Sequence, residues 1–384
     1  MAFSASTAGR MFRRPLSRRE LLGAALLGAL LAWYLSAGTP RPASLPSSPA
    51  NSAPMRVDGI TVITLNSSLQ APWGMAFLPD GRLLITQKAG SMVLLSADGR
   101  NIEATIGGLP PVVNAGQGGL LDVALDPDFA TAPWVYWTYA EAGSGAEAGL
   151  SGTAVARGRL IGDRLIDVAV IYRQVPKVGG NGHFGSRLVF RSDRTLFVTL
   201  GDRQKGGPAQ DLATTIGKVI RIERDGSIPP DNPAIAGARR EIWSYGHRNP
   251  QGAALRPGSD ELWINEHGPQ GGDELNRVLG GANYGWPLVS YGCPYGQPVG
   301  GACRIGGGTH APAFREPVSF WVPISIAPAG LLFYSGKGFP EWQGNAFVGA
   351  LAGTALWRIR LDGDREVGRQ RLLAQLGERI RKVA

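Results

Sequence analysis

The chain has 384 residues, of which 43% are apolar, so it is long enough for one large domain or two average ones. Its 55 glycines and 28 prolines indicate many turns and favour a β-rich fold. The formal net charge of +9 is concentrated at the two ends. Residues 1–50 carry six arginines and one glutamate, and residues 358–384 carry eight basic and four acidic side chains. Because the part between is close to neutral, the composition excludes a broad basic surface for nucleic acid.

The N-terminal residues have the features of an export signal. Arg18-Arg19 precedes the apolar run 21–35, and Ser36-Ala37-Gly38 supplies small residues for cleavage. The paired arginines resemble a twin-arginine (Tat) signal, although Glu20 departs from that pattern. We predict that residues 1–38 are a Tat-like signal peptide or, as the alternative, an uncleaved membrane anchor. The Pro-, Ser- and Ala-rich residues 39–56 are predicted to be a disordered linker, and the protein to be periplasmic.

The only two cysteines support an oxidising compartment. Cys293 and Cys303 lie ten residues apart in a segment rich in glycine and proline. In an exported protein this spacing predicts a small disulfide that closes a loop.

Residues 57–384 repeat one local pattern. Short runs rich in aromatic and β-branched residues alternate with turns of the Pro-Asp-Gly type, and these runs fall within residues 74–86, 120–139, 187–200, 252–265 and 330–349. Many short strands at irregular spacings of several tens of residues predict an all-β protein with a β-propeller fold. A β-sandwich is the alternative, but the region is long for one. A helical period is suggested only within residues 365–381.

One of the four histidines stands in a glycine-rich loop. His183 lies between Gly182 and Phe184-Gly185, where no core requires it. If residues 187–200 form a hairpin, Asp202 returns to the same sheet edge and reaches His183. A carboxylate on one ring nitrogen fixes the tautomer and raises the basicity of the other, as a general base requires. The alternative is a histidine that only hydrogen-bonds a loop backbone.

Two further motifs are rich in polar groups next to proline and glycine. Arg248-Asn249-Pro250-Gln251 places a fork of donors on a rigid turn, which suits the carboxylates and carbonyls of a planar ligand. A polar turn between blades is the alternative. In residues 265–276, the carbonyls at Gly268-Pro269 and the nearby acidic side chains are oxygen ligands of the kind that Ca²⁺ prefers, although their spacing alone does not decide for a metal.

Four motifs together resemble a known family. From about Gly74 to the C-terminus, the chain is similar to the pyrroloquinoline quinone (PQQ)-dependent soluble glucose dehydrogenases and periplasmic aldose sugar dehydrogenases. The motifs that carry the resemblance occur in the same order: residues 116–121 (Gly-Gln-Gly-Gly-Leu-Leu), 182–185 (Gly-His-Phe-Gly), 246–252 (Gly-His-Arg-Asn-Pro-Gln-Gly) and 266–269 (Glu-His-Gly-Pro). The resemblance implies a six-bladed propeller that carries PQQ and Ca²⁺ on one face.

The resemblance also implies roles for individual residues. His183 would take a proton from the anomeric hydroxyl while hydride passes to the quinone, Asp202 would orient His183, and Arg248 would stabilise the quinone oxygen. The cofactor contacts would come from Gln117, Arg248, Asn249, Gln251, Arg379 and Arg381. Gly268 and Pro269 would bind the Ca²⁺ of the cofactor through their carbonyls, and Glu274 and Tyr284 match a second, structural Ca²⁺ site.

The chain departs from the family pattern in two places. Many relatives place a lysine against the quinone where this chain has Ala352, so Lys337 or an arginine is expected to replace it. The match to the last blade stops shortly after Arg381, from which we expect an incomplete blade and lower stability.

The predicted function is therefore PQQ-dependent oxidation of an aldose to its lactone, with an electron acceptor that the sequence does not identify. Two alternatives within the same fold are a propeller that binds carbohydrate or protein without redox turnover, and an inactive truncated homologue. A propeller lactonase is disfavoured, because the Arg248 fork would then have no flat anionic ligand. Nicotinamide chemistry is also disfavoured, since no Gly-x-Gly-x-x-Gly turn opens a helix.

Overall fold

The computed structural model describes residues 55–300 and 302–384, and the predicted signal segment lies outside them. Apart from the two-stranded hairpin of residues 55–62, the described strands form five antiparallel sheets of four strands each, in which consecutive strands are neighbours. The first two sheets consist of β3 (Pro72–Phe77), β4 (Leu83–Gln87), β5 (Ser91–Leu95) and β6 (Ile102–Thr105), and of β7 (Leu120–Leu125), β8 (Trp134–Ala142), β9 (Ser151–Ile161) and β10 (Arg164–Arg173).

The remaining three sheets have the same meander topology. They consist of β11 (Leu188–Phe190), β12 (Leu196–Leu200), β13 (Lys218–Ile222) and β14 (Ile242–Tyr245); of β15 (Pro250–Leu255), β16 (Leu262–Glu266), β17 (Asp273–Val278) and β18 (Ser319–Trp321); and of β19 (Pro328–Phe333), β20 (Ala346–Ala350), β21 (Ala355–Asp362) and β22 (Arg365–Leu372).

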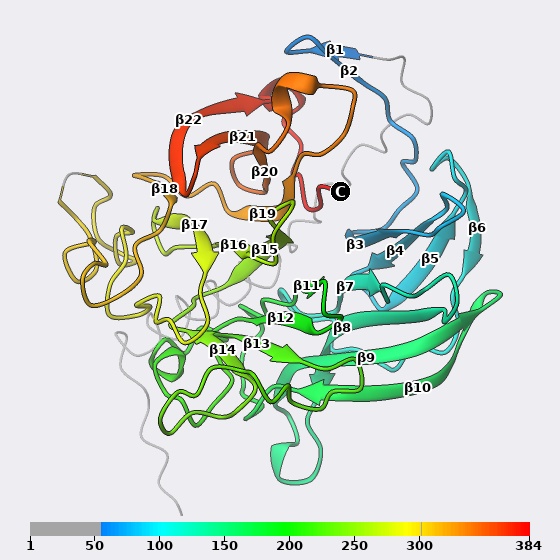
Figure 1. Ribbon diagram of the computed structural model, residues 1–384, viewed down its shortest axis with the longest axis horizontal. Helices are drawn as coiled ribbons and strands as arrows, with labels where there is room; N and C mark the ends of the chain where they lie inside the picture. Colours follow the sequence, from blue (N-terminus) through cyan, green and yellow to red (C-terminus); the bar gives the residue numbers. More distant parts are fainter. Residues whose placement is uncertain (1–54, 301) are drawn as a thin grey trace, which may run out of the picture. The chain divides into compact units, whose positions relative to one another are not determined.

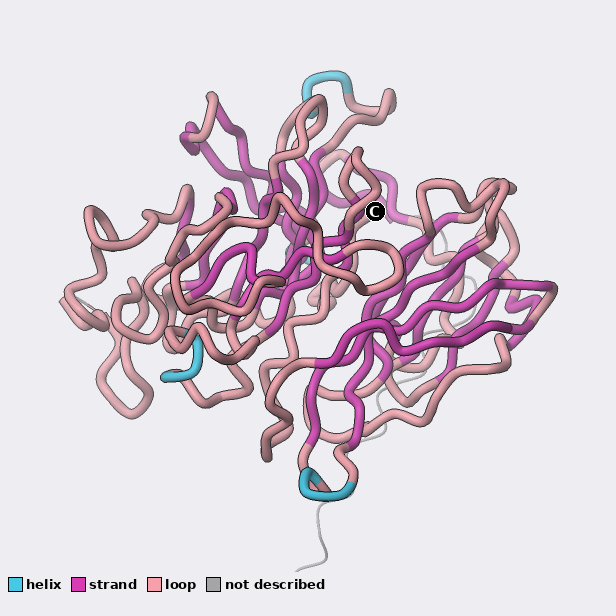
Figure 2. The backbone as a smooth tube through the Cα atoms, turned by 60° about the horizontal axis from the view of Figure 1, so that its bottom comes forward, coloured by secondary structure: helices cyan, strands magenta, loops and turns pink. Residues whose placement is uncertain are grey.

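The five sheets are arranged as the blades of a propeller. Their first strands, β3, β7, β11, β15 and β19, lie toward the middle, and the later strands lie outward (Figure 1). The helical residues of the described chain are confined to four short 3-10 turns (Figure 2). The predicted all-β propeller is confirmed, with five blades in the described residues.

Two segments stand apart from these blades. A hairpin of β1 (Met55–Val57) and β2 (Ile60–Val62) contacts the turn η4 (Ala374–Leu376), where Asp58 accepts hydrogen bonds from the Leu373 amide and the Gln375 side chain. The C-terminal segment 377–384 runs beside β19 and β20, because the Gly330 amide donates to Arg381 and the Ile380 amide donates to Ala350.

Two local expectations are corrected. Residues 365–381, for which a helical period was suggested, do not form a helix, because β22 pairs with β21 over residues 365–372. β1 begins at Met55, inside the range 39–56 that was expected to be a linker. In the described part of the chain, no helix is long and apolar enough to cross a membrane.

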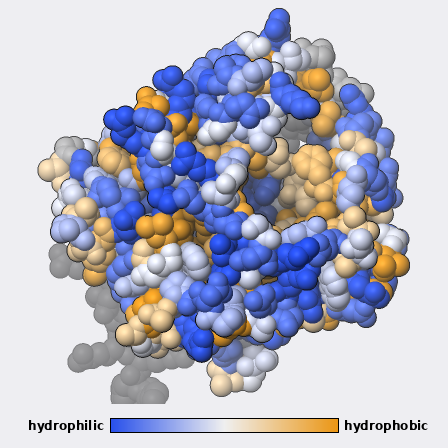
Figure 3. Space-filling model, in the orientation of Figure 1, coloured by the Kyte–Doolittle hydropathy of each residue, from blue (hydrophilic) through white to orange (hydrophobic). Residues whose placement is uncertain are grey.

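The core lies between neighbouring blades, because alternate residues of a strand face opposite sides. On β8, Tyr136 packs toward the third sheet, whereas Trp137 packs against the first. On β16, Trp263 packs toward the fifth sheet, and Ile264 faces the third. Seen from one side, the rim is mostly hydrophilic and apolar residues gather nearer the middle (Figure 3). Each blade is therefore held by its neighbours.

A buried ion pair joins the inner strands. Arg187, just before β11, donates to Asp122 on β7 at 3.0 Å and to the carbonyl oxygen of Gln251 on β15 at 2.6 Å. Its guanidinium lies 4.1 Å from the ring of Trp73 on β3 and also donates to the Arg381 carbonyl. One side chain thus contacts three blades and the C-terminal segment.

We predict that Asp122→Ala strongly destabilises the fold. The substitution leaves the Arg187 charge buried without its partner, which costs about 3–5 kcal/mol. Urea unfolding of the two proteins measures the difference, with the exposed Asp163→Ala as the control for loss of an aspartate. A loss no larger than that of the control would contradict the role of this ion pair.

Candidate active site

His183 and Asp202 form a close pair. Nδ1 of His183 lies 2.6 Å from Oδ1 of Asp202, and both side chains are buried. β11 and β12 form the expected hairpin, which brings the two residues to one sheet edge. Within the described chain no donor or acceptor reaches Nε2 of His183. The ring therefore has one nitrogen held by a carboxylate and the other available to a ligand.

The backbone around this pair is strained. His183, Arg203 and Gln204 have φ values of +52°, +53° and +60°. Side chains other than glycine rarely adopt this region, and such residues concentrate at functional sites. A Cβ on Gly201 would come within 2.2 Å of the His183 carbonyl oxygen, so only glycine allows the two segments to approach this closely.

Besides the imidazole contact, two donors hold the Asp202 carboxylate and one hydrogen bond holds its backbone. The indole of Trp286 donates to Oδ2 at 2.7 Å and the Gln204 amide donates to Oδ1 at 2.8 Å, while the Asp202 amide donates to the Arg248 carbonyl. Burial alone would raise the pKa of Asp202, but the hydrogen bonds from His183, Gln204 and Trp286 bring this pKa below its ordinary value. The carboxylate stays ionised and orients the histidine.

Arg203 stiffens the loop that carries His183. Its guanidinium donates to the carbonyls of Gly182 at 2.9 Å and Ser151 at 2.7 Å, and it lies 3.7 Å from the Phe184 ring centroid. Burial lowers the pKa of Arg203 to about 10. Both residues that flank His183 are thus fixed by one buried cation.

Arg248 lies beside this pair. Its guanidinium donates to the His267 carbonyl at 3.2 Å and to the Tyr295 hydroxyl at 3.1 Å, and it lies 5.1 Å from the Trp286 ring centroid. Its Nε is buried and has no partner among the described residues. A buried donor without a partner is costly, so the guanidinium is suited to an additional acceptor.

The three amides selected from the sequence gather next to His183. Oε1 of Gln117 accepts from the His183 amide at 2.8 Å, and Oδ1 of Asn249 accepts from the Gly185 amide at 3.2 Å. Nε2 of Gln251 donates to the Gly185 carbonyl at 3.0 Å. Nδ2 of Asn249 is buried and finds no acceptor in the described chain.

The two C-terminal arginines behave differently. Arg381 donates to Oε1 of Gln251 at 2.6 Å and lies 5.3 Å from the Trp73 ring. It therefore belongs to the cluster of polar side chains around His183. Burial and the like charges of Arg187 and Arg379 lower the pKa of Arg381 to about 9. Arg379 is exposed and forms no hydrogen bond or ion pair within the described residues. The structure therefore brings Arg381, but not Arg379, into contact with the other predicted residues.

Three of the four expected metal residues line a cavity beside Arg248. Its lining includes Gly268, Glu274 and Tyr284. The carbonyls of Gly268 and Pro269 accept no hydrogen bond from the described residues. No three His, Cys, Asp or Glu side chains of the described chain are placed to hold a metal ion together. A cation here would therefore depend on main-chain oxygens.

Glu274 and Tyr284 already have protein partners. Glu274 lies 3.3 Å from Nε2 of His310 and accepts from Asn276, and burial raises its pKa. The Tyr284 hydroxyl donates to the Arg277 carbonyl at 2.6 Å and accepts from the Leu279 amide. This hydroxyl is used by the β17 backbone, so only the main-chain carbonyl of Tyr284 is suited to ligate a metal.

Several residues of the cluster were not selected from the sequence. Lys88 donates to Asn114 at 2.8 Å, and burial together with the charge of Arg381 lowers its pKa. Lys382 lies 3.9 Å from Asp122, whereas Lys337, which was expected to replace a missing lysine, is exposed on a loop beyond β19. No local motif marked Lys88, because only the ring of blades brings it near Arg381.

The fold and this cluster define a β-propeller with a buried His–Asp pair facing an arginine-rich pocket. The chain belongs to the glucose/sorbosone dehydrogenase family, whose model matches residues 69–384. The family resemblance predicted from the sequence is confirmed.

Named relatives agree with this assignment. The aldose sugar dehydrogenase YliI of Escherichia coli is 43% identical over 329 residues, which cover 84% of this chain and 86% of that protein. The quinoprotein glucose dehydrogenase B of Acinetobacter calcoaceticus is 30% identical over 72% of this chain and 61% of its own length. A solved PQQ-bound aldose sugar dehydrogenase from Streptomyces coelicolor is 30% identical, with a TM-score of 0.69 over 88% of this chain and 90% of that one.

We predict an acid-dependent contribution of Asp202 to stability. Its folded-state pKa lies below the ordinary value of 3.8, so the stabilisation is complete above that pH and is lost as the pH falls through the folded-state pKa. Urea unfolding of the wild type and Asp202→Asn from about pH 5.5 to about pH 3 should show a difference that shrinks with acidification. A difference that widened in this range would contradict the prediction.

Proposed function

We propose that this protein oxidises aldose sugars at the anomeric carbon to the lactone, with PQQ as the redox cofactor and Ca²⁺ as its metal. The observation that carries the proposal is the His183–Asp202 pair, which faces a pocket of unused donors on Arg248 and Asn249. A dehydrogenase of this kind requires a base, a cofactor that accepts hydride and positive charge where negative charge develops. The names of the relatives support a sugar as substrate and PQQ as cofactor.

The residues of the pocket fit PQQ, which is flat and carries carboxylates and carbonyl oxygens. Arg381 is a partly buried cation whose pKa is lowered by burial and by the like charges of Arg187 and Arg379, so a bound anion would relieve that repulsion. Arg248, Asn249, Gln251 and Gln117 would contact the cofactor, which when bound supplies the hydride acceptor. Arg379 is carried over from the resemblance alone, because its side chain is exposed here.

His183 acts as the general base in this proposal. Asp202 holds its Nδ1, so Nε2 is the atom that receives the proton of the anomeric hydroxyl. Trp286 and Gln204 keep the carboxylate in place, and the Arg248 guanidinium would supply the positive charge that a bound quinone oxygen requires. The positive charge and the base thus come from side chains whose orientations are fixed before substrate binds.

The free carbonyls of Gly268 and Pro269 are the oxygen donors proposed for the Ca²⁺ that accompanies the cofactor. A second Ca²⁺ is proposed at Glu274 and the Tyr284 carbonyl, where a cation would favour the ionised form of a buried carboxylate whose pKa burial raises. Both assignments agree with the preference of Ca²⁺ for carboxylate and main-chain oxygens.

The proposal also includes a sixth blade and export to the periplasm. We infer that the β1–β2 hairpin and segment 377–384 belong to a sixth blade, since both contact the region around the fifth blade. Export to the periplasm, by a signal or with an anchor in residues 1–38, is proposed from the sequence and supported by the disulfide between Cys293 and Cys303.

We predict that His183→Ala removes most of the activity. The full-length protein is loaded with PQQ and Ca²⁺, and aldose-dependent reduction of a dye is followed. Loss of the base should lower kcat by about a hundredfold to ten-thousandfold, while PQQ still binds. Asp163→Ala serves as the control. A wild-type protein that binds sugar but never reduces the dye would favour the alternative of a binding propeller.

A second prediction concerns the cofactor. Arg381→Gln should weaken PQQ binding about tenfold to a hundredfold, because a hydrogen bond to a charged group contributes about 1.5–3 kcal/mol. Titration of PQQ followed by its absorbance measures the change, with Arg371→Gln on β22 as the matched control. If Arg381→Gln bound PQQ as tightly as the control, Arg381 would not belong to the cofactor site.

A further inference from the structure

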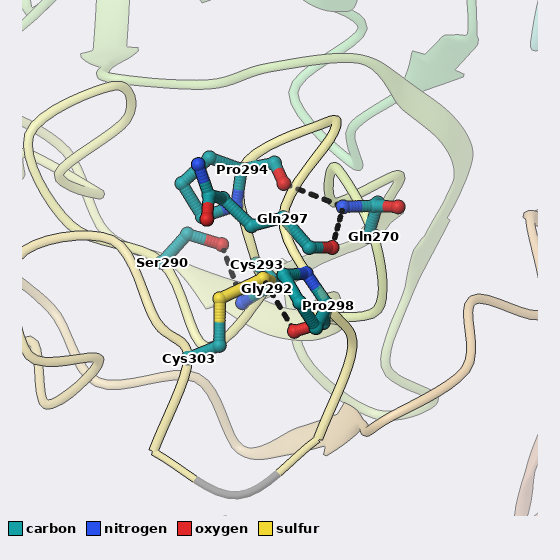
Figure 4. Close-up of a disulfide and its surroundings, with 8 residues drawn as sticks. All are labelled: Gln270, Ser290, Gly292, Cys293, Pro294, Gln297, Pro298 and Cys303. Atoms are coloured by element: carbon teal, nitrogen blue, oxygen red, sulfur yellow. Dashed lines mark hydrogen bonds between the residues drawn. A yellow bond between two sulfur atoms is a disulfide. The ribbon is translucent and has the colours of Figure 1, made fainter.

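A disulfide-closed loop lies next to the active site. The disulfide loop, of which residues 293–300, 302 and 303 are described, is joined at its ends by Cys293 and Cys303, whose Cα atoms are 5.1 Å apart. Gln270 pairs with Cys293 in both directions, at 3.1 Å and 2.9 Å. The Gln270 side chain also donates to the carbonyls of Pro294 and Gln297 (Figure 4). Gln270 directly follows Gly268-Pro269, so the disulfide loop is fixed to the segment proposed to hold Ca²⁺.

Tyr295 extends from this loop to Arg248. Its side chain is 69% exposed, yet its hydroxyl accepts a hydrogen bond from the Arg248 guanidinium at 3.1 Å. The guanidinium carbon lies 5.8 Å from the Tyr295 ring centroid and 5.1 Å from that of Trp286. Arg248 thus contacts two aromatic rings, one fixed to Asp202 and the other open to solvent.

The exposed ring has the properties of a sugar contact. Tyrosine combines an apolar ring face with a polar tip, which suits the C–H face and the hydroxyl groups of a pyranose. An exposed aromatic ring that only filled space would not need a hydrogen bond to an active-site arginine and a loop closed by a disulfide. None of the four motifs that identify the family contains Tyr295.

We propose that Tyr295 is a specificity-determining residue that forms the solvent-side wall of the aldose site. This inference rests on the proposed function, because it assumes that a sugar lies near His183 and Arg248. The disulfide and Gln270 hold the ring in position, so that substrate binding does not have to order the loop. Tyr295 acts on sugar affinity and not on the transfer of the proton.

The first test separates KM from kcat in the protein loaded with PQQ and Ca²⁺. Tyr295→Ala should raise KM for glucose about tenfold, an effect of the size expected for loss of one aromatic contact, and leave kcat within about threefold. Tyr295→Phe keeps the ring and should raise KM less than Tyr295→Ala. Phe77→Ala, which removes an exposed ring at the far end of β3, is the matched control.

The second test does not require turnover. Binding of 1,5-anhydroglucitol, a sugar without an anomeric hydroxyl, is measured by calorimetry on the loaded wild type, Tyr295→Ala and Phe77→Ala. The proposal predicts about tenfold weaker binding only in Tyr295→Ala. If only Tyr295→Ala bound 1,5-anhydroglucitol more weakly, and the wild type oxidised no aldose, the inference would be supported and the proposed function rejected. Equal KM and equal affinity in Tyr295→Ala and the control would overturn the inference and leave the proposed function standing.

The anchoring of the ring is tested by the double variant Cys293→Ser/Cys303→Ser. It should raise KM in the same direction as Tyr295→Ala, by a smaller factor, with PQQ affinity unchanged. PQQ affinity is also measured in Tyr295→Ala. If it fell enough to account for the higher KM of that variant, Tyr295 would position the cofactor, and its assignment to the sugar site would be overturned.

Discussion

The site depends on one buried cation. Arg187 contacts the inner strands of three blades and the C-terminal segment through Asp122, Trp73, Gln251 and Arg381. Taking a guanidinium out of water is costly, and this geometry offsets that cost only while all the partners stay in place. The residues that hold Arg187 are also the neighbours of the proposed cofactor contacts, so the packing of the middle of the propeller and the shape of the pocket cannot vary independently.

The pocket itself contains more donors than the protein can satisfy. Asn249 and Arg248 have buried nitrogens without acceptors in the described chain, and Arg381 lies near other positive charges. Because these nitrogens lie together beside His183, one bound acceptor could pair with several of them. Their excess positive charge and unused donors are the physical reason to expect a flat anion, and the adjacent His183–Asp202 pair is the reason to expect proton transfer.

Much of this arrangement could be predicted from the sequence. The pattern of short strands and turns was sufficient to predict a propeller. A blade strand is buried on both faces, as Tyr136 and Trp137 show by packing toward opposite blades, so it shows in the sequence as a short apolar run between turns. The approach of Asp202 to His183 followed from a local hairpin. Contacts made only when the blades close into a ring were not predictable, among them Arg187 with Asp122 and Lys88 near Arg381. The suggested helix within residues 365–381 was wrong because pairing with β21 outweighs the local period.

The most direct test of the central claim is an absorbance titration of the full-length protein with PQQ in the presence of Ca²⁺, followed by anaerobic addition of glucose. The account predicts saturation at one PQQ per chain and reduction of the bound quinone by the sugar, with binding but no reduction in His183→Ala. Absence of saturable PQQ binding would contradict the account, because the unused donors around Arg248 and Arg381 would then have no flat anionic ligand.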